Sequence, residues 1–415
     1  EMGGALNIVP AEDFIRERNG GRQKVSVDQG RDWWNRITIS GQEDDRGIIE
    51  GMKFSVSTGA AREEMCDLFT SGNVIEQLVE TISTDNRWTK EKAATIFELL
   101  MPNAFKSRLK RHGNITWVLD KYSAGFPWEL LQNKGEDVKP LCINAGMIRQ
   151  LATGNSRLNI ELVTSETALV VGDPQLNGFL PQLRGALEEA SAVNKVLMAN
   201  GYNPNFLPQA GQESIIPALM SGSYKIIHLA GHGVFDPDPR KPSGMVIGKD
   251  NFLTTRQLAQ MSDTPDLVFV NCCFLGKTDA AAEKYYQSRY KLAAGFGTQL
   301  IENGVKAVVV AGWAVDDTAA SLFATHFYQN MFAGLPFGEA VRKAREVIYN
   351  NNSGVNTWGA YQCYGNPFYR LKAEGRVREE KKYVITEQAE IDLVNLDSDM
   401  RTGDYTPEEI LTRLQ

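Results

Sequence analysis

Long hydrophobic runs are absent from this sequence. No stretch approaches the roughly 18 consecutive apolar residues of a membrane-spanning helix, and residues 1–20 mix acids, bases and glycines in place of the apolar core of a secretory signal. We therefore expect a cytoplasmic protein that does not bind a membrane. Because the sequence begins at Glu1 and not with Met, we also expect it to be a processed or trimmed part of a longer protein.

Cysteines are scarce as well. The sequence holds 5 cysteines and no C-x-x-C pair, whereas a disulfide framework needs an even, dense set in a short secreted chain and a structural zinc site needs closely spaced ligands. We expect reduced thiols, no bound metal and no cofactor. Three of the cysteines are expected to have only a packing role: Cys66, Cys142 and Cys363.

A strongly basic composition is also missing. Lys and Arg number 44 against 51 Asp and Glu, which gives a net charge of −7. Proteins that coat nucleic acid carry a basic surface, so we expect no direct nucleic-acid partner, although one local basic patch would be compatible with this total. The 42% apolar and 23% charged residues are ordinary values for a globular protein.

Between residues 166 and 370 the sequence has a regular pattern. Continuous Val, Ile and Leu runs alternate there with amphipathic stretches, which predicts an α/β fold with a mostly parallel sheet and helices on both faces. The buried strands are expected at 168–171, 224–229, 267–270 and 307–311, and the main helices at 183–198, 292–302, 318–332 and 338–349.

The length of 415 residues predicts two or three domains. Residues 1–61 are polar and glycine-rich, with short strand-like pieces at 24–27 and 53–56 but no segment that would form a core, whereas the apolar residues of 62–109 have helical spacing. We expect four segments: an N-terminal extension (1–61), a smaller α/β companion region (62–165), the main α/β domain (166–370) and a charged C-terminal tail (371–415).

Two predicted strands end in residues with catalytic chemistry. The strand 225–230 runs into Gly-His-Gly at 231–233, and the strand 267–270 runs into Asn-Cys-Cys at 271–273. Ligands bind at the carboxyl ends of the strands in open parallel sheets. An imidazole there can take the proton of a thiol so that the thiolate attacks a carbonyl, and glycines let backbone N–H groups approach an oxyanion. The alternative is a buried structural histidine beside inert core cysteines.

The order of these residues favours one type of protease. His232 precedes Cys273 by 41 residues, and in caspases the histidine lies about 50 residues before the cysteine, whereas in papain-like enzymes the cysteine comes first. The caspase signature Gln-Ala-Cys is not present. A shared metal is excluded by reach, because His228 and His232 would lie about 13 Å apart along a strand. We expect a structural role for His228, inside the strand.

The residues at these strand ends resemble those of the CHAT domain, a family of caspase- and separase-related peptidases. Six motifs carry the resemblance, which extends over about residues 75–369. They are His228-Leu229-Ala230-Gly231-His232-Gly233, Leu267-Val268-Phe269-Val270-Asn271-Cys272-Cys273-Phe274-Leu275-Gly276, Phe126-Pro127-Trp128-Glu129-Leu130-Leu131, Val171-Gly172-Asp173-Pro174, Gly312-Trp313-Ala314-Val315-Asp316-Asp317 and Trp358-Gly359-Ala360-Tyr361-Gln362-Cys363-Tyr364-Gly365-Asn366-Pro367.

The resemblance implies a caspase-like peptidase domain over 166–370, with 62–165 as the N-terminal half of the CHAT region. It implies that His232 is the catalytic histidine and Cys273 the nucleophile, although Cys272 beside it stays an alternative. The N–H groups of Gly233 and Cys273 would then hold the oxyanion. Asn271 stands where the related metacaspases carry an acid that receives a basic substrate residue, which is a departure from that pattern.

The resemblance also suggests acidic residues for substrate binding. Asp317 is the nearest match to an acid that follows a Trp-x-Val element in separase-like members, and Asp316 lies beside it. A carboxylate in a pocket would select Arg or Lys through a charge-assisted pair. The alternative for both residues is to cap the helix that follows. Asp173 is a further acidic candidate and could equally be a turn residue.

The function implied is that of a cysteine endopeptidase that cleaves a specific protein target. Members of this family tend to be effectors in bacterial defence and programmed cell death, in which a regulatory or sensor partner protein releases the protease. The alternative is a catalytically silent caspase-like scaffold for protein–protein interaction.

Overall fold

The computed structural model describes most of the chain between residues 34 and 371. The described residues are 34–43, 49–57, 63–69, 74, 77–81, 87–109, 113–134, 138–154, 161–163, 165–235, 243–272, 289–313 and 315–371. Cys273, the tail that we expect at 371–415 except for its first residue, and the first half of the expected N-terminal extension lie outside these ranges.

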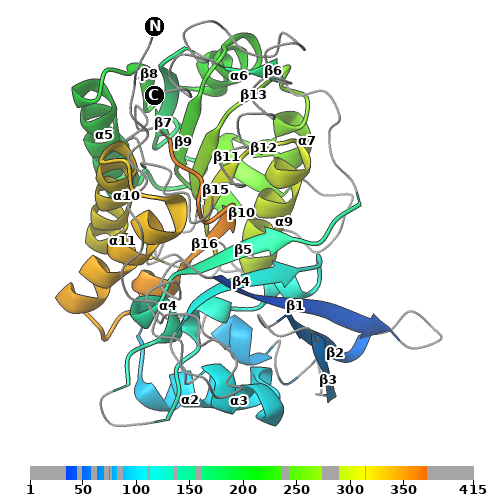
Figure 1. Ribbon diagram of the computed structural model, residues 1–415. Coiled ribbons are helices and arrows are strands. Elements are labelled where there is room, and N and C mark those ends of the chain that lie inside the picture. Colours follow the sequence, from blue (N-terminus) through cyan, green and yellow to red (C-terminus); the bar gives the residue numbers. More distant parts are fainter. Residues whose placement is uncertain are drawn as a thin grey trace, which may run out of the picture. The chain divides into compact units, whose positions relative to one another are not determined.

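One mixed sheet organises the described residues. Its strands are β1 (Trp34–Glu43), β2 (Ile49–Ser57), β3 (Glu63–Phe69), β4 (Asn114–Leu119), β5 (Met147–Leu151), β7 (Thr167–Gly172), β8 (Asn203–Pro208), β9 (Ile226–Ala230), β14 (Leu267–Asn271), β15 (Ala307–Ala311) and β16 (Tyr361–Gly365). They lie in the order β3-β2-β1-β4-β5-β16-β15-β14-β9-β7-β8 (Figure 1). Only the pairs β1–β2, β2–β3 and β15–β16 are antiparallel within this described sheet. The prediction of a mostly parallel sheet is confirmed.

Helices cover both faces of the sheet (Figure 1). One layer holds α5 (Arg184–Ala199), α10 (Asp317–Phe332) and α11 (Phe337–Asn351), and the other holds α6 (Gln212–Ser221), α7 (Thr255–Leu258) and α9 (Arg289–Glu302). Alternate strand residues supply the two cores: Phe269 of β14 packs under the first layer, whereas Val268 and Val270 pack under the second. The predicted α/β fold with two helical layers is therefore confirmed.

Shorter elements connect these strands and helices. They are α2 (Lys90–Leu100), α3 (Asn103–Leu109), α4 (Leu141–Asn144), the 3-10 turns η2 (Ser123–Gly125), η3 (Trp128–Leu130) and η4 (Asn356–Gly359), and the short strands β6 (Glu161–Leu162), β10 (Gly233–Val234), β11 (Gly244–Gly248), β12 (Asn251–Thr254) and β13 (Asp263–Thr264). None of the helices in the described ranges is both long and apolar enough to cross a membrane.

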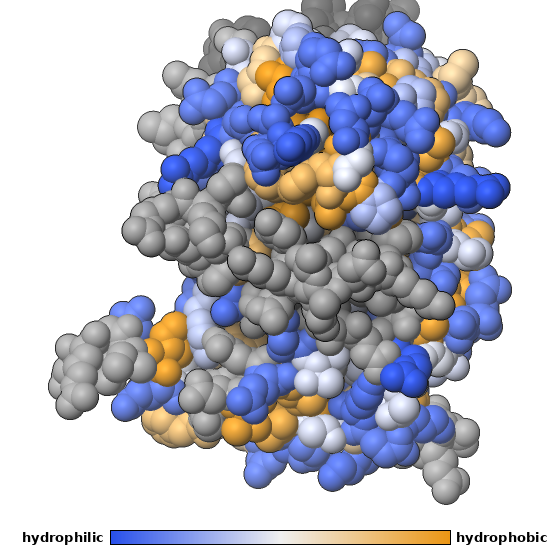
Figure 2. Space-filling model, turned by 180° about the vertical axis from the view of Figure 1, so that it is seen from behind, coloured by the Kyte–Doolittle hydropathy of each residue, from blue (hydrophilic) through white to orange (hydrophobic). Residues whose placement is uncertain are grey.

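The N-terminal part of the sheet differs from what the sequence suggested. The strand-like piece expected at 53–56 lies in β2, but we expected no core there, whereas β1 and β2 bury Ile37, Ile39, Met52 and Phe54. The helical spacing expected from residue 62 onward is also wrong for β3, because pairing with β2 imposes a period of two there. The exposed side of β3 carries large apolar side chains, and Figure 2 shows hydrophobic residues on the lower part of the molecule, which β1–β3 and α2–α3 form.

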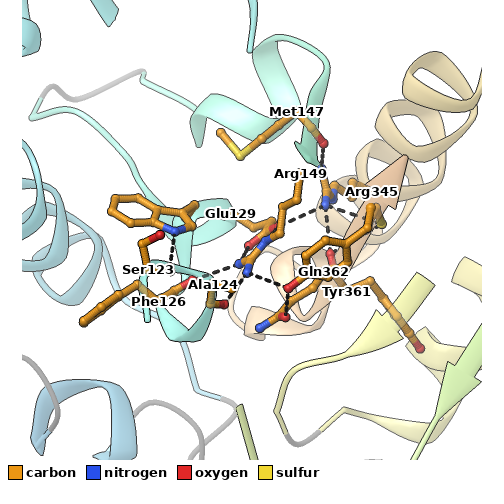
Figure 3. A network of polar contacts seen from close by, with 12 residues as sticks. Ser123, Ala124, Phe126, Glu129, Met147, Arg149, Arg345, Tyr361 and Gln362 are labelled. Atoms are coloured by element: carbon orange, nitrogen blue, oxygen red, sulfur yellow. Dashed lines mark hydrogen bonds and ion pairs between the residues drawn. The ribbon is translucent and has the colours of Figure 1, made fainter. Parts of the chain in front are cut away.

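A buried ion pair within the companion region also contacts β16 (Figure 3). Arg149 of β5 donates to both carboxylate oxygens of Glu129, over 2.8 and 2.5 Å, and neither side chain is exposed. The same guanidinium donates to the carbonyl oxygens of Ala124 and Phe126 and contacts the Tyr364 hydroxyl on β16 at 3.4 Å. Since a buried charge is stable only when it is paired and hydrogen-bonded, this cluster fixes the position of the Phe126–Leu131 motif against β5 and β16.

Candidate active site

Three strands end side by side at one edge of the sheet. Gly172 of β7, Ala230 of β9 and Asn271 of β14 are direct partners across the ladder. The residues that follow these ends therefore begin at the same level, as the strand-end rule for parallel sheets requires. They are Asp173, the Gly-His-Gly segment at 231–233 and Cys272, the last described residue before Cys273.

The Gly-His-Gly segment at 231–233 is in direct contact with Asn271 and Cys272. The N–H of Gly231 donates to the carbonyl oxygen of Asn271 over 3.0 Å. A Cβ atom added at Gly233 would lie 2.2 Å from the carbonyl oxygen of Cys272, closer than any real side chain approaches. Only glycine permits this approach. The structure thus brings residues 231–233 against Cys272, while Cys273 itself lies outside the described residues.

The ring of His232 is held through its Nε2 atom. Its Nε2 lies 2.7 Å from the carbonyl oxygen of Pro181, and only 2% of the residue is exposed. A carbonyl oxygen can only accept, so Nε2 carries the proton, and in the neutral ring Nδ1 is then the basic nitrogen. The backbone is fixed too, because the His232 carbonyl accepts from the N–H of Val246 over 2.8 Å.

Asp173 holds the loop that presents Pro181. One of its carboxylate oxygens accepts from the N–H of Leu183 over 2.7 Å, and the other accepts from the Gln209 side chain over 3.2 Å. The residue is 1% exposed and adopts a positive φ of 50°. Both of the carboxylate oxygens are thus used within the protein, and the bonds favour the turn role that the sequence left open beside substrate binding.

The described thiols lie in packed surroundings. Cys272 is 3% exposed and belongs to the apolar core under α6, α7 and α9. Burial raises the pKa of both Cys142 and Cys363 to about 12, so these thiols stay protonated near neutral pH. Cys66 of β3 is half-buried and packs against the core. The packing role expected for Cys66, Cys142 and Cys363 is confirmed.

Asp316 and Asp317 stand at the start of α10 in different surroundings. Asp316 is the N-cap, and its carboxylate accepts from the N–H of Ala319 over 3.0 Å. Asp317 is an exposed residue, and its carboxylate lies over Gly185 of α5, where an added Cβ would be 2.3 Å from the Asp317 Cγ. Burial of its inner side and the neighbouring acids Asp316, Glu189 and Glu188 raise the pKa of Asp317 to about 6.

A buried polar cluster beneath the strand ends was not predicted. Glu189 of α5 is 1% exposed, and its carboxylate accepts from the side-chain amide of Asn271 over 2.6 Å. The other oxygen lies 3.3 Å from Nε2 of His228, whose Nδ1 lies 3.4 Å from the Tyr328 hydroxyl. The sequence did carry a sign of it, because Glu189 falls on the apolar stripe of an amphipathic helix: the buried residues of α5 are Gly185, Ala186, Glu189, Ala190, Val193 and Leu197.

A cavity among the described residues lies elsewhere. It measures about 450 Å³ and lies between the η2 turn and one face of α9, lined by Tyr122, Phe126, Lys291 and Thr298 among others. None of its lining residues belongs to the three strand ends. Within the described ranges, no group of three or more His, Cys, Asp or Glu residues could hold a metal ion.

Residues 90–366 match the CHAT domain family, and the chain belongs to this family. A comparison with curated proteins gives no match in sequence.

Solved structures with a similar fold include several proteases. One is gingipain R (RgpB) of Porphyromonas gingivalis, an Arg-specific cysteine proteinase, at 13% identity over 71% of this chain and 74% of that chain, with a TM-score of 0.42. Another is the separase–securin complex of Saccharomyces cerevisiae, at 11% identity over 80% of this chain and 30% of that chain, with a TM-score of 0.44. The Drosophila initiator caspase Dronc follows, at 9% identity over 53% and 87%, with a TM-score of 0.31. At these identities the likeness concerns the fold alone.

Proposed function

We propose that the chain is a cysteine endopeptidase in which His232 and Cys273 form the catalytic pair. The observation that carries the proposal is the contact of Gly233 with Cys272, because it puts the histidine step against the residue that precedes Cys273. The apolar packing of Cys272 supports Cys273 as the nucleophile of the two. The Pro181 carbonyl, which keeps the proton on Nε2 of His232, supports Nδ1 as the base.

The mechanism follows from these roles. Nδ1 of His232 takes the proton of the Cys273 thiol, and the thiolate attacks the scissile carbonyl carbon to form a C–S bond. The N–H groups of Gly233 and Cys273 stabilise the oxyanion. The peptide C–N bond then breaks as the imidazolium gives its proton to the leaving amine. Water, deprotonated by the same imidazole, hydrolyses the thioester, releases the acid product and restores the thiol.

Asp317 is our candidate for the residue that binds a basic substrate side chain. Asp317 is an exposed residue at the start of α10, whereas Asp316 uses its carboxylate to cap the helix. A carboxylate of this kind binds Arg or Lys through charge-assisted hydrogen bonds. Asp173 stays a weaker candidate, since both of its oxygens already have protein partners.

The biological role is proposed from the family resemblance. The protease would cleave one specific protein target in the cytoplasm after release by a regulatory or sensor partner, as an effector of bacterial defence or programmed cell death. The excess of acidic residues supports delegation of any nucleic-acid sensing to that partner.

Cleavage of a peptide library tests the proposal. We expect the wild-type protein to cleave after basic residues, and we expect His232→Ala and Cys273→Ala to abolish cleavage in protein that is still folded. Cleavage that persists in Cys273→Ala would overturn the assignment of the nucleophile. Absence of cleavage in the wild type, together with a Cys273 that reacts with an acyloxymethyl ketone peptide no faster than Cys66, would favour the scaffold.

A further inference from the structure

The buried cluster of Glu189, Asn271, His228 and Tyr328 connects elements that carry the candidate site. Glu189 lies on α5, Asn271 ends β14, His228 lies in β9, and Tyr328 lies on α10. His228 is enclosed by aromatic rings, with centroid distances of 4.9 Å to Phe269 and 5.8 Å to Tyr328. All of these polar side chains are at least nine-tenths buried, so their mutual contacts are little screened by water.

Asn271 takes part in the site through both its main chain and its side chain. Its carbonyl oxygen accepts from the N–H of Gly231, the residue before His232. Its side-chain amide donates to Glu189 over 2.6 Å. Because Asn271 also stands two positions before Cys273, a shift of this one residue would move both members of the catalytic pair.

The helix that carries Glu189 also borders the loop behind His232. α5 begins at Arg184, directly after Leu183, whose N–H is bonded to Asp173. Pro181, which accepts from His232, lies three residues before that start. The carboxylate of Glu189 therefore contacts the middle of β9, at His228, and the end of β14, at Asn271, from the same helix whose N-terminal end adjoins the Pro181 loop.

Stability alone does not account for this cluster. Among the described residues, Oδ1 of Asn271 has no hydrogen-bond partner, and the 3.3 Å contact between Glu189 and His228 does not have hydrogen-bond geometry. A buried polar network that is only partly satisfied stabilises a fold less than apolar side chains of the same volume would. Such unsatisfied groups in a folded protein call for another reason, and a functional site is the common one.

We propose that Glu189 is a positioning residue for the catalytic pair, which it holds in place through Asn271 and His228. The inference rests on the proposed function and adds a residue to it. Glu189 does not touch the substrate in this role. It sets the direction of the Asn271 amide, since a carboxylate accepts only from the NH₂ group, and it fixes the separation of β9 and β14.

The bond between Asn271 and Glu189 also accounts for the amide at position 271, where the metacaspases carry an acid. A carboxylate at that position would face the carboxylate of Glu189 at about the 2.6 Å that now separates Nδ2 from Oε2. Two buried carboxylates at this distance cannot both be ionised. An amide at 271 and a carboxylate at 189 are therefore matched to each other, and exchanging them is the most specific test of the contact.

The experiment measures kcat and KM on a basic library peptide, together with the rate at which iodoacetamide alkylates Cys273. The measurements are made at pH 8, where Asp317, with its pKa of about 6, is ionised in every variant. A change in the charge of Asp317 therefore does not contribute to the differences between variants. We expect Glu189→Gln to lower kcat and the alkylation rate at least about tenfold with KM within about threefold, because small misplacements of reacting groups cost up to about 100-fold. The control is Glu188→Gln, the neighbouring exposed acid paired with Arg184 on the surface, which should stay within twofold.

The reciprocal exchange separates positioning from folding. We expect Asn271→Asp to lose activity more severely than Glu189→Gln, and the double variant Glu189→Gln/Asn271→Asp, which restores one amide–carboxylate bond, to recover at least about fivefold over Asn271→Asp. If Glu189→Gln does not fold, the comparison of Asn271→Asp with the double variant tests the proposal by itself. A double variant no more active than Asn271→Asp overturns the proposal. Equal kcat in Glu189→Gln and wild type also overturns it. Wild-type protein that cleaves no better than Cys273→Ala would instead overturn the proposed function.

Discussion

The carbonyl oxygen of Pro181 lies 2.7 Å from Nε2 of His232 and so keeps the proton on that nitrogen. A neutral imidazole with its proton on Nε2 has its lone pair on Nδ1, the atom that we propose as the base. The bond is made to a backbone atom, and its strength depends on how firmly the surrounding loop is held. That loop is secured by Asp173, Gln182 and Leu183.

Asp173→Ala tests this support. We expect kcat to fall about tenfold or more, because Leu183 and Gln209 lose their acceptor and the loop with Pro181 can move. The free energy of unfolding should fall by about 1–3 kcal/mol, the cost of unsatisfied buried donors. Asp173→Asn keeps one acceptor oxygen and tolerates the positive φ, so it should retain most of the activity. Equal kcat in Asp173→Ala and wild type, measured by peptide cleavage, would show that the loop needs no such support.

Gly233→Ala tests the contact between the Gly-His-Gly segment at 231–233 and Cys272. The new methyl group would overlap the Cys272 carbonyl, so we expect at least about tenfold lower kcat and a loss of about 1–3 kcal/mol in unfolding free energy. Gly295→Ala is the matched control, because nothing lies within 4 Å of an added Cβ at this position of α9. It should keep full activity and gain about 0.5–1 kcal/mol from better helix propensity. Full activity in both variants would contradict the close approach.

The raised pKa of Asp317 predicts a pH dependence of substrate binding. For a peptide with Arg before the scissile bond, KM should rise as the pH falls through about 6, because protonation removes the negative charge of this carboxyl. Asp317→Asn should raise KM roughly tenfold or more at pH 8 and remove the dependence. Asp316→Asn is the control, since Asn caps a helix as well as Asp does. A wild-type KM that is flat from pH 5 to pH 8 would exclude Asp317 from the binding of the basic side chain.

The same shift affects stability. The folded state holds the Asp317 proton more tightly than the unfolded chain does, so this carboxyl lowers the free energy of unfolding as the pH rises from about 4 to about 6. We expect Asp317→Asn to have a higher Tm than wild type above pH 6 and the same Tm below pH 4. A Tm difference that does not change with pH would contradict the raised pKa.

Glu129→Gln tests the buried ion pair of the companion region. Arg149 is fully buried and would lose its only bidentate partner among the described residues, so we expect the free energy of unfolding to fall by about 3–5 kcal/mol. The comparison is Glu188→Gln, which breaks an exposed pair with Arg184 and should cost less than about 1 kcal/mol. Urea denaturation of the two variants measures both values, and equal losses would contradict the structural importance of the buried pair.

The central strands were predictable because their chemistry is local. Apolar runs such as Ala168–Val171 are typical of strands that are buried on both faces of a sheet. The predicted bounds of β7, β9, β14 and β15 therefore agree with the observed bounds to within one or two residues. The Gly-His-Gly and Asn-Cys-Cys steps follow those strands directly, so their meeting at one edge was also predictable. By contrast, β3 reads as helical in isolation, and only its pairing with β2 decides otherwise.

The supports of the site were not predictable in the same way. The acceptor of His232 is a backbone carbonyl, which leaves no mark in the sequence. Glu189 meets Asn271 and His228 only because three elements separated along the chain converge. The only local indication in the sequence was the carboxylate of Glu189 on the apolar side of α5, and it does not predict which residues Glu189 contacts.

The reactivity of Cys273 as a function of pH tests the catalytic pair most directly. Iodoacetamide labelling, with the alkylated peptides identified by mass spectrometry, gives the rate for each thiol, and Cys66 on β3 serves as the internal reference. We expect Cys273 to react at least about tenfold faster than Cys66 at pH 7, with a thiol ionisation below the ordinary value of about 8.5, and we expect His232→Ala to remove the difference. A Cys273 that reacts no faster than Cys66, with a rate unchanged in His232→Ala, would show that the two residues do not act together.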